Sequence, residues 1–158
     1  MGTLKTHRLD LNSADFVQTV ITAVKAIAGE KKNRRDLRFS APSYFAVPSG
    51  DVPEKAGWYI ILGDGKPIYV GTTSSLHARL NTPHGSLDNF AAASRTSDSE
   101  RNFIKKFIEI GIVQNPEVIL VTEEELFARV PLPVPVPLDK CERESLEKVI
   151  NIFRSVIV

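Results

Sequence analysis

The stretch GWYIILGDGKPIYVGTTSSLHAR (residues 57–79) decides how the fold is interpreted. Two runs rich in aromatic and β-branched residues, GWYIIL and PIYVG, flank the Gly-bearing segment GDGK. This pattern predicts two antiparallel strands joined by a short turn. Because side chains alternate along a strand, Tyr59 and Tyr69 can share one face of the hairpin, about 5 Å apart or one diagonal away, if the register is right. Arg79 lies on the helix expected next and can lean back over that face.

The rest of the chain supplies further helices and a third strand. The expected order is a helix capped by Asn12 or Ser13 and ending at Gly29, the hairpin, helices in SLHARL and SERNFIKKFIEIG, a strand at 117–121, and a helix from Lys140 to near the C-terminus. A short strand at 44–47 is also allowed, and PLPVPVP (131–137) is expected to be an extended connector. This order predicts an α+β domain with a small, three-stranded, mainly antiparallel sheet flanked by helices.

Composition places the chain among ordinary globular proteins. It has 158 residues, 42% hydrophobic and 25% charged, with a net charge of +1, which does not by itself favour a nucleic-acid partner. No run of apolar residues is long enough to span a membrane. The first residues lack the features of a secretory signal, and Cys141 is the single cysteine, so we expect a cytoplasmic location. Residues 1–50 are expected to form an N-terminal helix and a basic loop that extend the main unit at 51–158, all in one compact body.

Charge is nevertheless uneven along the chain. The segment EKKNRRDLR (30–38) is basic, which is typical of a solvated loop and less often of a patch that contacts phosphates. If it binds nucleic acid, the contacts are expected from four cations: Lys31, Lys32, Arg34 and Arg35.

Two phenols and a guanidinium on one face suit phosphodiester chemistry. A guanidinium offers a planar fork of donors to phosphate oxygens and can stabilise the charge of the transition state. A phenol can orient a water molecule or accept its proton with help from a neighbouring cation. A carboxylate is also needed to hold Mg²⁺ or Mn²⁺. The last helix offers three candidates in CERESLEK: Glu142, Glu144 and Glu147.

These residues resemble the GIY-YIG nuclease superfamily, which includes homing endonucleases, the incision subunit of bacterial excision repair and some restriction enzymes. The resemblance rests on GWY, nine intervening residues, YVG, Arg79 ten positions after Tyr69, and a later helix with a Glu behind a third strand. It covers the chain from about Val52 onward. It implies a metal-dependent endonuclease, more often of DNA than of RNA, with Mg²⁺ or Mn²⁺ as cofactor.

The resemblance also assigns roles to individual residues. It implies that Tyr59 and Tyr69 position or activate the attacking water, that Arg79 binds the scissile phosphate, and that a helix Glu holds the metal. Trp58 replaces the usual aliphatic residue of the first motif. Many members carry a His four residues after the Arg; that place is Pro83 here, so the auxiliary candidates are His77 and His84.

Two observations bear on which glutamate would hold the metal. Local similarity to homing endonucleases favours Glu144. Helical phase instead places Glu142 on the expected inward face of the helix, which is formed by Leu146, Val149, Ile150 and Phe153. We therefore expect Glu142 as the metal ligand and Glu144 as the runner-up. The alternative for Glu142 is a capping box with Asp139, whose spacing it also fits.

Two other functions stay open. One is a nucleic-acid-binding member with a degenerate, inactive site, and the other is an unrelated interaction domain in which the tyrosines are core aromatics. The small size and near-neutral charge suggest that targeting comes from another domain, another chain or a second protomer.

Overall fold

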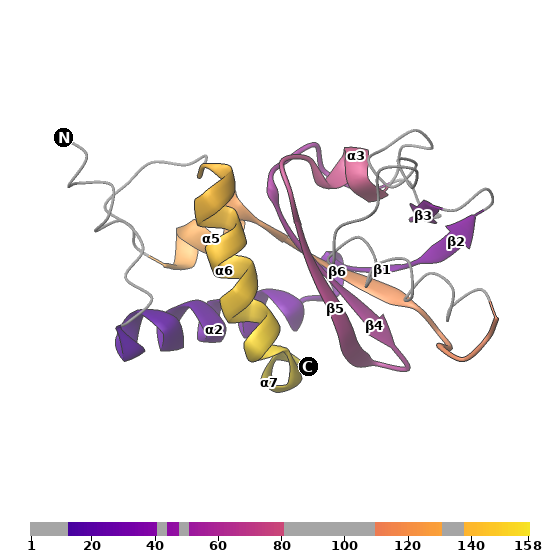
Figure 1. The fold of residues 1–158 in the computed structure, drawn as a ribbon, viewed down its shortest axis with the longest axis horizontal. Coiled ribbons are helices and arrows are strands. Elements are labelled where there is room, and N and C mark those ends of the chain that lie inside the picture. Colours follow the sequence, from indigo (N-terminus) through magenta and orange to yellow (C-terminus); the bar gives the residue numbers. More distant parts are fainter. Residues whose placement is uncertain (1–12, 41–43, 48–50, 81–109, 131–137) are drawn as a thin grey trace.

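In the computed structural model, the described residues are 13–40, 44–47, 51–80, 110–130 and 138–158. They form an α+β domain whose main sheet has four antiparallel strands in the order β1-β6-β4-β5 (Figure 1). The four strands are β1 (Arg34–Asp36), β4 (Gly57–Gly63), β5 (Lys66–Thr73) and β6 (Glu117–Thr122). The predicted fold class is confirmed in general, but the prediction of three strands was wrong because β1 adds a fourth. A separate pair, β2 (Arg38–Ser40) and β3 (Tyr44–Ala46), forms a small second sheet.

The hairpin of β4 and β5 is confirmed. Its turn is Asp64–Gly65, and both residues have positive φ, 52° and 78°, as a tight two-residue hairpin turn requires. The register shifts after Ile61, because Ile61 pairs with Tyr69 but Leu62 pairs with Pro67, which leaves Ile68 as an extra residue. The turn is also held from outside the hairpin, since the Asp64 N–H donates to the carbonyl of Gln114 at 2.8 Å.

Strand β4 is paired along both edges, with β5 and β6, and it is buried on both faces because an apolar cluster covers each side of the sheet. The sheet therefore separates two apolar clusters, and each strand contributes alternate residues to them. The helix-side core takes from the sheet Trp58, Ile60, Leu62, Val70, Ile119 and Val121. The tyrosine-side core takes from the sheet Tyr59, Ile61, Tyr69, Val118 and Leu120.

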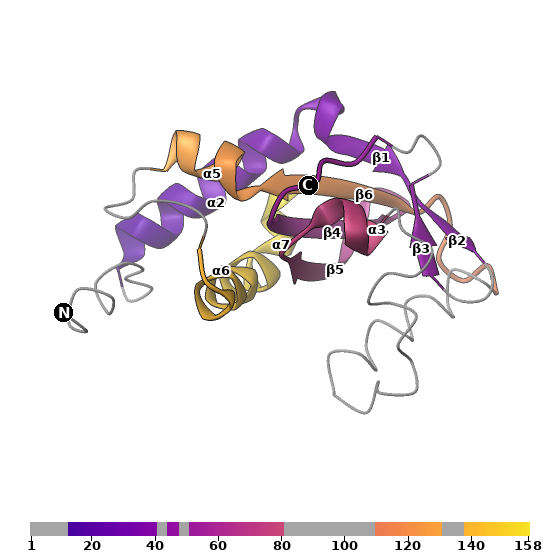
Figure 2. The ribbon, with the colours of Figure 1, turned by 90° about the horizontal axis from the view of Figure 1, so that it is seen from above.

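Among the helices of the described residues, four cover the helix-side core and α3 (Leu76–Leu80) lies across the sheet from them (Figures 1 and 2). The four are α2 (Ala14–Ala28), α5 (Glu123–Arg129), α6 (Lys140–Ile152) and α7 (Arg154–Ile157). On the opposite side, α3 and the pair β2–β3 face the tyrosine-side core. The sheet is thus a middle layer, with its tyrosines turned away from α6.

The ends of the long helices follow from their caps. Ser13 accepts a hydrogen bond from the Phe16 N–H at 3.2 Å and begins α2, one of the two caps expected. In the last helix, Leu146, Val149 and Ile150 are buried as predicted. The prediction that Phe153 points inward was wrong, because α6 ends there and the side chain is 37% exposed. A short separate turn, α7, returns Ile157 to the core.

Helix α5 was not expected from the sequence. Thr122 caps it by accepting a hydrogen bond from the Glu125 N–H at 3.0 Å, and Leu126 is fully buried. One pattern in the sequence could have predicted this helix: Thr122 is followed three residues later by Glu125, which directly precedes an apolar residue. At seven residues the helix is too short for a clear apolar period.

Helix α2 and strand β1, which precede position 51, pack with the residues that follow. Strand β1 pairs with β6, with Arg35 opposite Val118, and α2 contributes Val20, Val24 and Ile27 to the core around Trp58. The basic segment is therefore a 3-10 turn (Lys31–Asn33) followed by an edge strand, and not the loop that was expected.

Other predictions lie outside the described residues. These are most of the helix over 99–111, the connector 131–137, and His84. Within the described part of the chain, no helix has the length and hydropathy of a membrane span.

Candidate functional site

The two tyrosines lie on one face of the sheet, one diagonal apart. Tyr59 pairs with Gly71 across the hairpin and Tyr69 pairs with Ile61. Their ring centroids are 6.1 Å apart and the ring planes are tilted by 42°. The expectation that both rings share a face is confirmed, and the register selects the diagonal arrangement of the two that were open.

Both tyrosines are buried. Tyr59 has an exposed fraction of 0% and Tyr69 of 6%. The Tyr59 Oη atom has no hydrogen-bond partner among the described residues. Buried polar atoms in native proteins are nearly always hydrogen bonded, and an unmade bond costs about 1–3 kcal/mol. This hydroxyl therefore needs an explanation beyond core packing.

Helix α3 brings Arg79 to the same side of the sheet. The helix begins at a turn in which Ser75 accepts a hydrogen bond from the Ala78 N–H at 3.2 Å. The Leu76 N–H donates to the carbonyl of Lys55 at 2.9 Å, which ties the start of α3 to the chain before β4. Leu76 and Leu80 are fully buried in the tyrosine-side core, so α3 packs on that face.

Arg79 is not a plain surface cation. It stands next to Leu80 on α3 and is half-buried, and its Nε atom is buried without a hydrogen-bond partner among the described residues. The face thus holds two buried polar atoms without described partners, one on a phenol and one on a guanidinium. A guanidinium is normally satisfied by carboxylate, carbonyl or phosphate oxygens.

Of the two auxiliary histidine candidates, only His77 lies in the described residues, and its imidazole lies near Glu54. His77 is half-buried, and its Nδ1 atom lies 4.0 Å from Oε1 of Glu54, an ion pair only if the imidazole is protonated. Its backbone N–H donates to the carbonyl of Pro53 at 3.1 Å. These contacts hold α3 to the preceding loop.

A capping box at the start of α6 fixes the position of the Glu142 side chain. The capping box with Asp139 is present: Oε1 of Glu142 accepts from the Asp139 N–H at 3.0 Å, and Oδ1 of Asp139 accepts from the Glu142 N–H at 2.8 Å. Helix α6 packs on the core around Trp58, across the sheet from Tyr59. The predicted inward orientation of Glu142 is confirmed by its exposure of 8%.

The arrangement does not fit a metal held by Glu142 beside the tyrosines. One carboxylate oxygen already caps the helix, and the helix lies on the other side of the sheet. Glu144 is exposed, two residues further along α6. Among the described residues, no three His, Cys, Asp or Glu side chains gather into a group that could hold a metal ion. The metal role of either glutamate stays a prediction of the resemblance.

A buried polar junction at the start of α6 was missed by sequence reasoning. Glu123, with a side chain 4% exposed, accepts from the Leu138 N–H at 2.9 Å and from Arg143 Nη1 at 3.3 Å. Arg143 Nη1 also donates to the carbonyl of Leu138 at 2.7 Å. The Trp58 indole N–H donates to the carbonyl of Arg143 at 2.9 Å.

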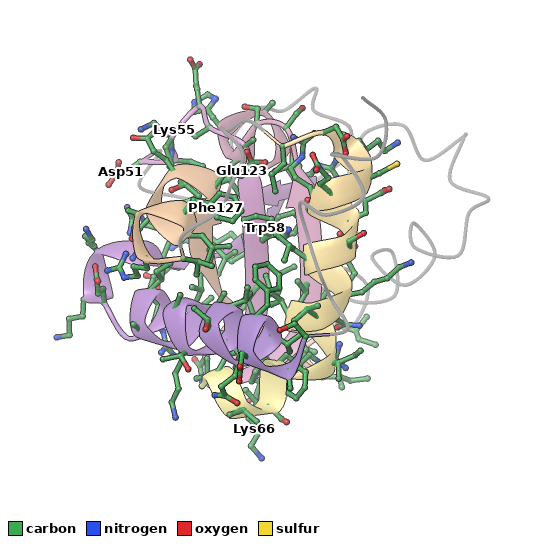
Figure 3. The ribbon with its side chains drawn as sticks, turned by 90° about the vertical axis from the view of Figure 1, so that its left-hand side faces the viewer. Asp51, Lys55, Trp58, Lys66, Glu123 and Phe127 are labelled. Carbon is green, nitrogen blue, oxygen red and sulfur yellow. The ribbon has the colours of Figure 1, made fainter. Side chains whose placement is uncertain are left out.

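Figure 3 looks onto this side of the molecule, where Trp58 and Phe127 lie between the sheet and the helices and Glu123 sits near the start of α5. The Trp58 and Phe127 rings meet edge-on, with centroids 6.5 Å apart. Together these contacts fix α5 and α6 to β4 next to Tyr59. No local sequence pattern predicts the pair of Glu123 and Arg143, because the two residues are twenty positions apart.

The basic segment is largely neutralised by carboxylates. Arg34 donates two hydrogen bonds to Glu117, at 2.9 and 3.1 Å. These bonds raise the pKa of Arg34, burial lowers it by less, and the Coulomb attraction of Glu117 adds a smaller increase. Arg35 bonds Asp51 at 3.1 Å, and Lys32 lies 3.3 Å from Glu30. Lys31 is exposed. A phosphate-binding role for these four cations stays a prediction.

Comparisons with family models, with curated proteins and with solved structures found no match to the chain.

Proposed function

We propose that the chain hydrolyses phosphodiester bonds in nucleic acid, with DNA as the preferred substrate, at the face formed by Tyr59, Tyr69 and Arg79. One observation carries the proposal. The Tyr59 Oη atom is buried in the tyrosine-side core, the Arg79 Nε atom is buried on α3, which packs on the same side of the sheet, and neither atom has a described partner. Their chemistry suits the oxygens of a phosphate and of a water molecule.

In this proposal each side chain has a separate task. The Arg79 guanidinium binds a phosphate oxygen and offsets the negative charge that grows in the transition state. The hydroxyl of Tyr59, which both donates and accepts, orients the attacking water, and Tyr69 packs beside it at 6.1 Å between ring centroids. A bound Mg²⁺ or Mn²⁺ would add positive charge at the phosphate. No step is assigned to it, because Glu142 does not fit as its ligand on this face.

A second candidate is a nucleic-acid-binding chain with an inactive site. It is favoured by the burial of both tyrosines, since Tyr59 is 0% exposed and so reaches no substrate unless the residues around it move. The capping box of Glu142 also favours this candidate, because it engages one oxygen of the carboxylate that would hold the metal of a nuclease.

Labelled DNA and RNA, each incubated with and without Mg²⁺ or Mn²⁺, separate the two candidates. We expect the wild type to cleave and Arg79→Ala to lose about 100-fold or more in rate, the usual effect of removing one group that stabilises transition-state charge. Lys66→Ala is the matched control, because it removes one positive charge from the exposed tip of the hairpin and is expected to leave the rate unchanged (Figure 3).

The remaining outcomes are also decisive. Equal cleavage by wild type and Arg79→Ala would refute the nuclease proposal. Salt-sensitive binding without cleavage under any metal condition would support the binding candidate. If the chain neither binds nor cleaves nucleic acid, both candidates are refuted, and an interaction domain of another kind is the function that remains.

A further inference from the structure

Gly71 is the cross-strand neighbour of Tyr59 in the hairpin. Paired residues of an antiparallel sheet direct their side chains to the same face, and directly opposite Cβ atoms lie about 5 Å apart. A side chain at position 71 would therefore enter the tyrosine-side core beside Tyr59. Gly71 is not among the glycines with positive φ, which are Gly65 and Gly111 in the described residues, so its backbone conformation does not demand glycine.

The space above Gly71 is filled by the Tyr59 ring. A Cβ atom built on Gly71 would lie 2.2 Å from Cζ, 2.4 Å from Oη and 2.6 Å from Cε1 of Tyr59. All three distances are far below van der Waals contact, and all three atoms belong to the hydroxyl end of one ring. The phenol thus rests directly on the glycine backbone.

The Tyr59 ring is also enclosed by other side chains of the tyrosine-side core. Tyr59 is fully buried, and Tyr69 packs against it with ring centroids 6.1 Å apart. Leu76 and Leu80 of α3 belong to the same cluster. Interiors packed this tightly accept an added methyl group only by shifting side chains or backbone.

We propose that Gly71 is a positioning residue for Tyr59, whose missing side chain sets where the phenol oxygen stands on the face that also carries Arg79. The steric relation holds whatever the protein does. Only its consequence for cleavage rests on the proposed function.

The first test is a double-mutant cycle on thermal stability, which needs no activity. Gly71→Ala is made in the wild type and in Tyr59→Leu, whose side chain lacks Cζ, Oη and Cε1. We expect Gly71→Ala to lower Tm by roughly 5 °C in the wild type through overpacking. In the Tyr59→Leu background the same change is expected to leave Tm unchanged or to raise it slightly, because Ala restricts the unfolded chain more than Gly does.

Two other glycines serve as controls. Gly29→Ala meets nothing closer than 3.5 Å and is expected to be tolerated in both backgrounds. Gly57→Ala would place its Cβ 2.1 Å from the carbonyl oxygen of Val121 on the next strand, so it is expected to destabilise both backgrounds equally. An equal loss of Tm from Gly71→Ala in both backgrounds would overturn the proposal, since glycine would then be required for a reason other than Tyr59.

The second test reports the position of the phenol itself. In protein labelled with 3-fluorotyrosine, the ¹⁹F signal of Tyr59, assigned with Tyr59→Phe, is expected to move in Gly71→Ala. If the chain cleaves nucleic acid, Gly71→Ala is expected to lower kcat about as much as Tyr59→Phe does, with KM little changed. An unmoved Tyr59 signal would refute the positioning role, whereas absence of wild-type cleavage would refute only the proposed function.

Should Gly71→Ala fail to fold, the double variant Gly71→Ala with Tyr59→Leu decides the matter. Recovery of a folded domain supports the steric relation with Tyr59, and continued failure contradicts it.

Discussion

Replacing Glu123 by Ala should be among the most destabilising single changes in α5. The side chain is 4% exposed, and its loss leaves the Arg143 guanidinium, 12% exposed, without its carboxylate and the Leu138 N–H without its acceptor. Removing one partner of a buried ion pair typically costs about 3–5 kcal/mol. For a chain of this size that corresponds to a fall in Tm of roughly 10 °C.

The neighbouring residue supplies a matched control. Glu124 lies in the same first turn of α5 and carries the same charge, but its side chain is 70% exposed and pairs with Lys55 at 3.0 Å. Exposed ion pairs contribute about 0–1 kcal/mol, so Glu124→Ala should cost no more than that. Any effect of negative charge at the helix N-terminus is common to both variants.

Urea unfolding followed by tryptophan fluorescence measures both changes. Trp58 is the single tryptophan of the chain, and its indole N–H bonds the carbonyl of Arg143, so the signal reports on the junction itself. Adding Arg143→Met to Glu123→Ala should recover part of the loss, because the uncompensated charge is then removed. A cost for Glu123→Ala no larger than that for Glu124→Ala would refute the view that this pair holds α6 to the sheet.

Two further predictions concern the site. Glu142→Gln should keep both the capping box and any cleavage activity, while Glu142→Ala should cost about 1 kcal/mol of stability in urea unfolding. Loss of Mg²⁺-dependent cleavage in Glu142→Gln at unchanged stability would instead make Glu142 the metal ligand that the resemblance predicts. Tyr59→Phe should leave the free energy of unfolding unchanged or raise it by up to about 1 kcal/mol, because the buried hydroxyl has no described partner, while lowering the cleavage rate. A stability loss well above 1 kcal/mol would show that the hydroxyl is bonded within the protein.

Local pattern was sufficient for the hairpin and for most helix ends. The Gly-bearing turn, the alternation of Trp58 and Tyr59 between opposite faces, and the caps at Ser13 and Asp139 each depend on residues a few positions apart. Such short-range preferences are written directly in the order of side chains, so they can be predicted without knowing the rest of the fold.

The basic segment (residues 30–38) adopts a structure that local sequence patterns did not predict. Arg34 and Arg35 look solvated in sequence, yet they lie on an edge strand paired with β6, where Glu117 and Asp51, 83 and 16 residues away, bind their guanidinium groups. Charged residues are common on edge strands, where they discourage further pairing. The partner that turns a basic loop into a strand is supplied by the fold.

The sequence by itself predicted a hairpin on which Tyr59 and Tyr69 can share one face if the register allows it, and a helix from which Glu142 points inward, because strand and helix periodicity are local. Only the tertiary structure decided which side of the sheet each helix covers. It places α3 and Arg79 with the tyrosines and α6 with Trp58, because the docking of a helix depends on contacts such as that between Trp58 and Arg143, 85 residues apart. Helical phase could show that Glu142 faces a core, but it could not show which of the two cores that would be.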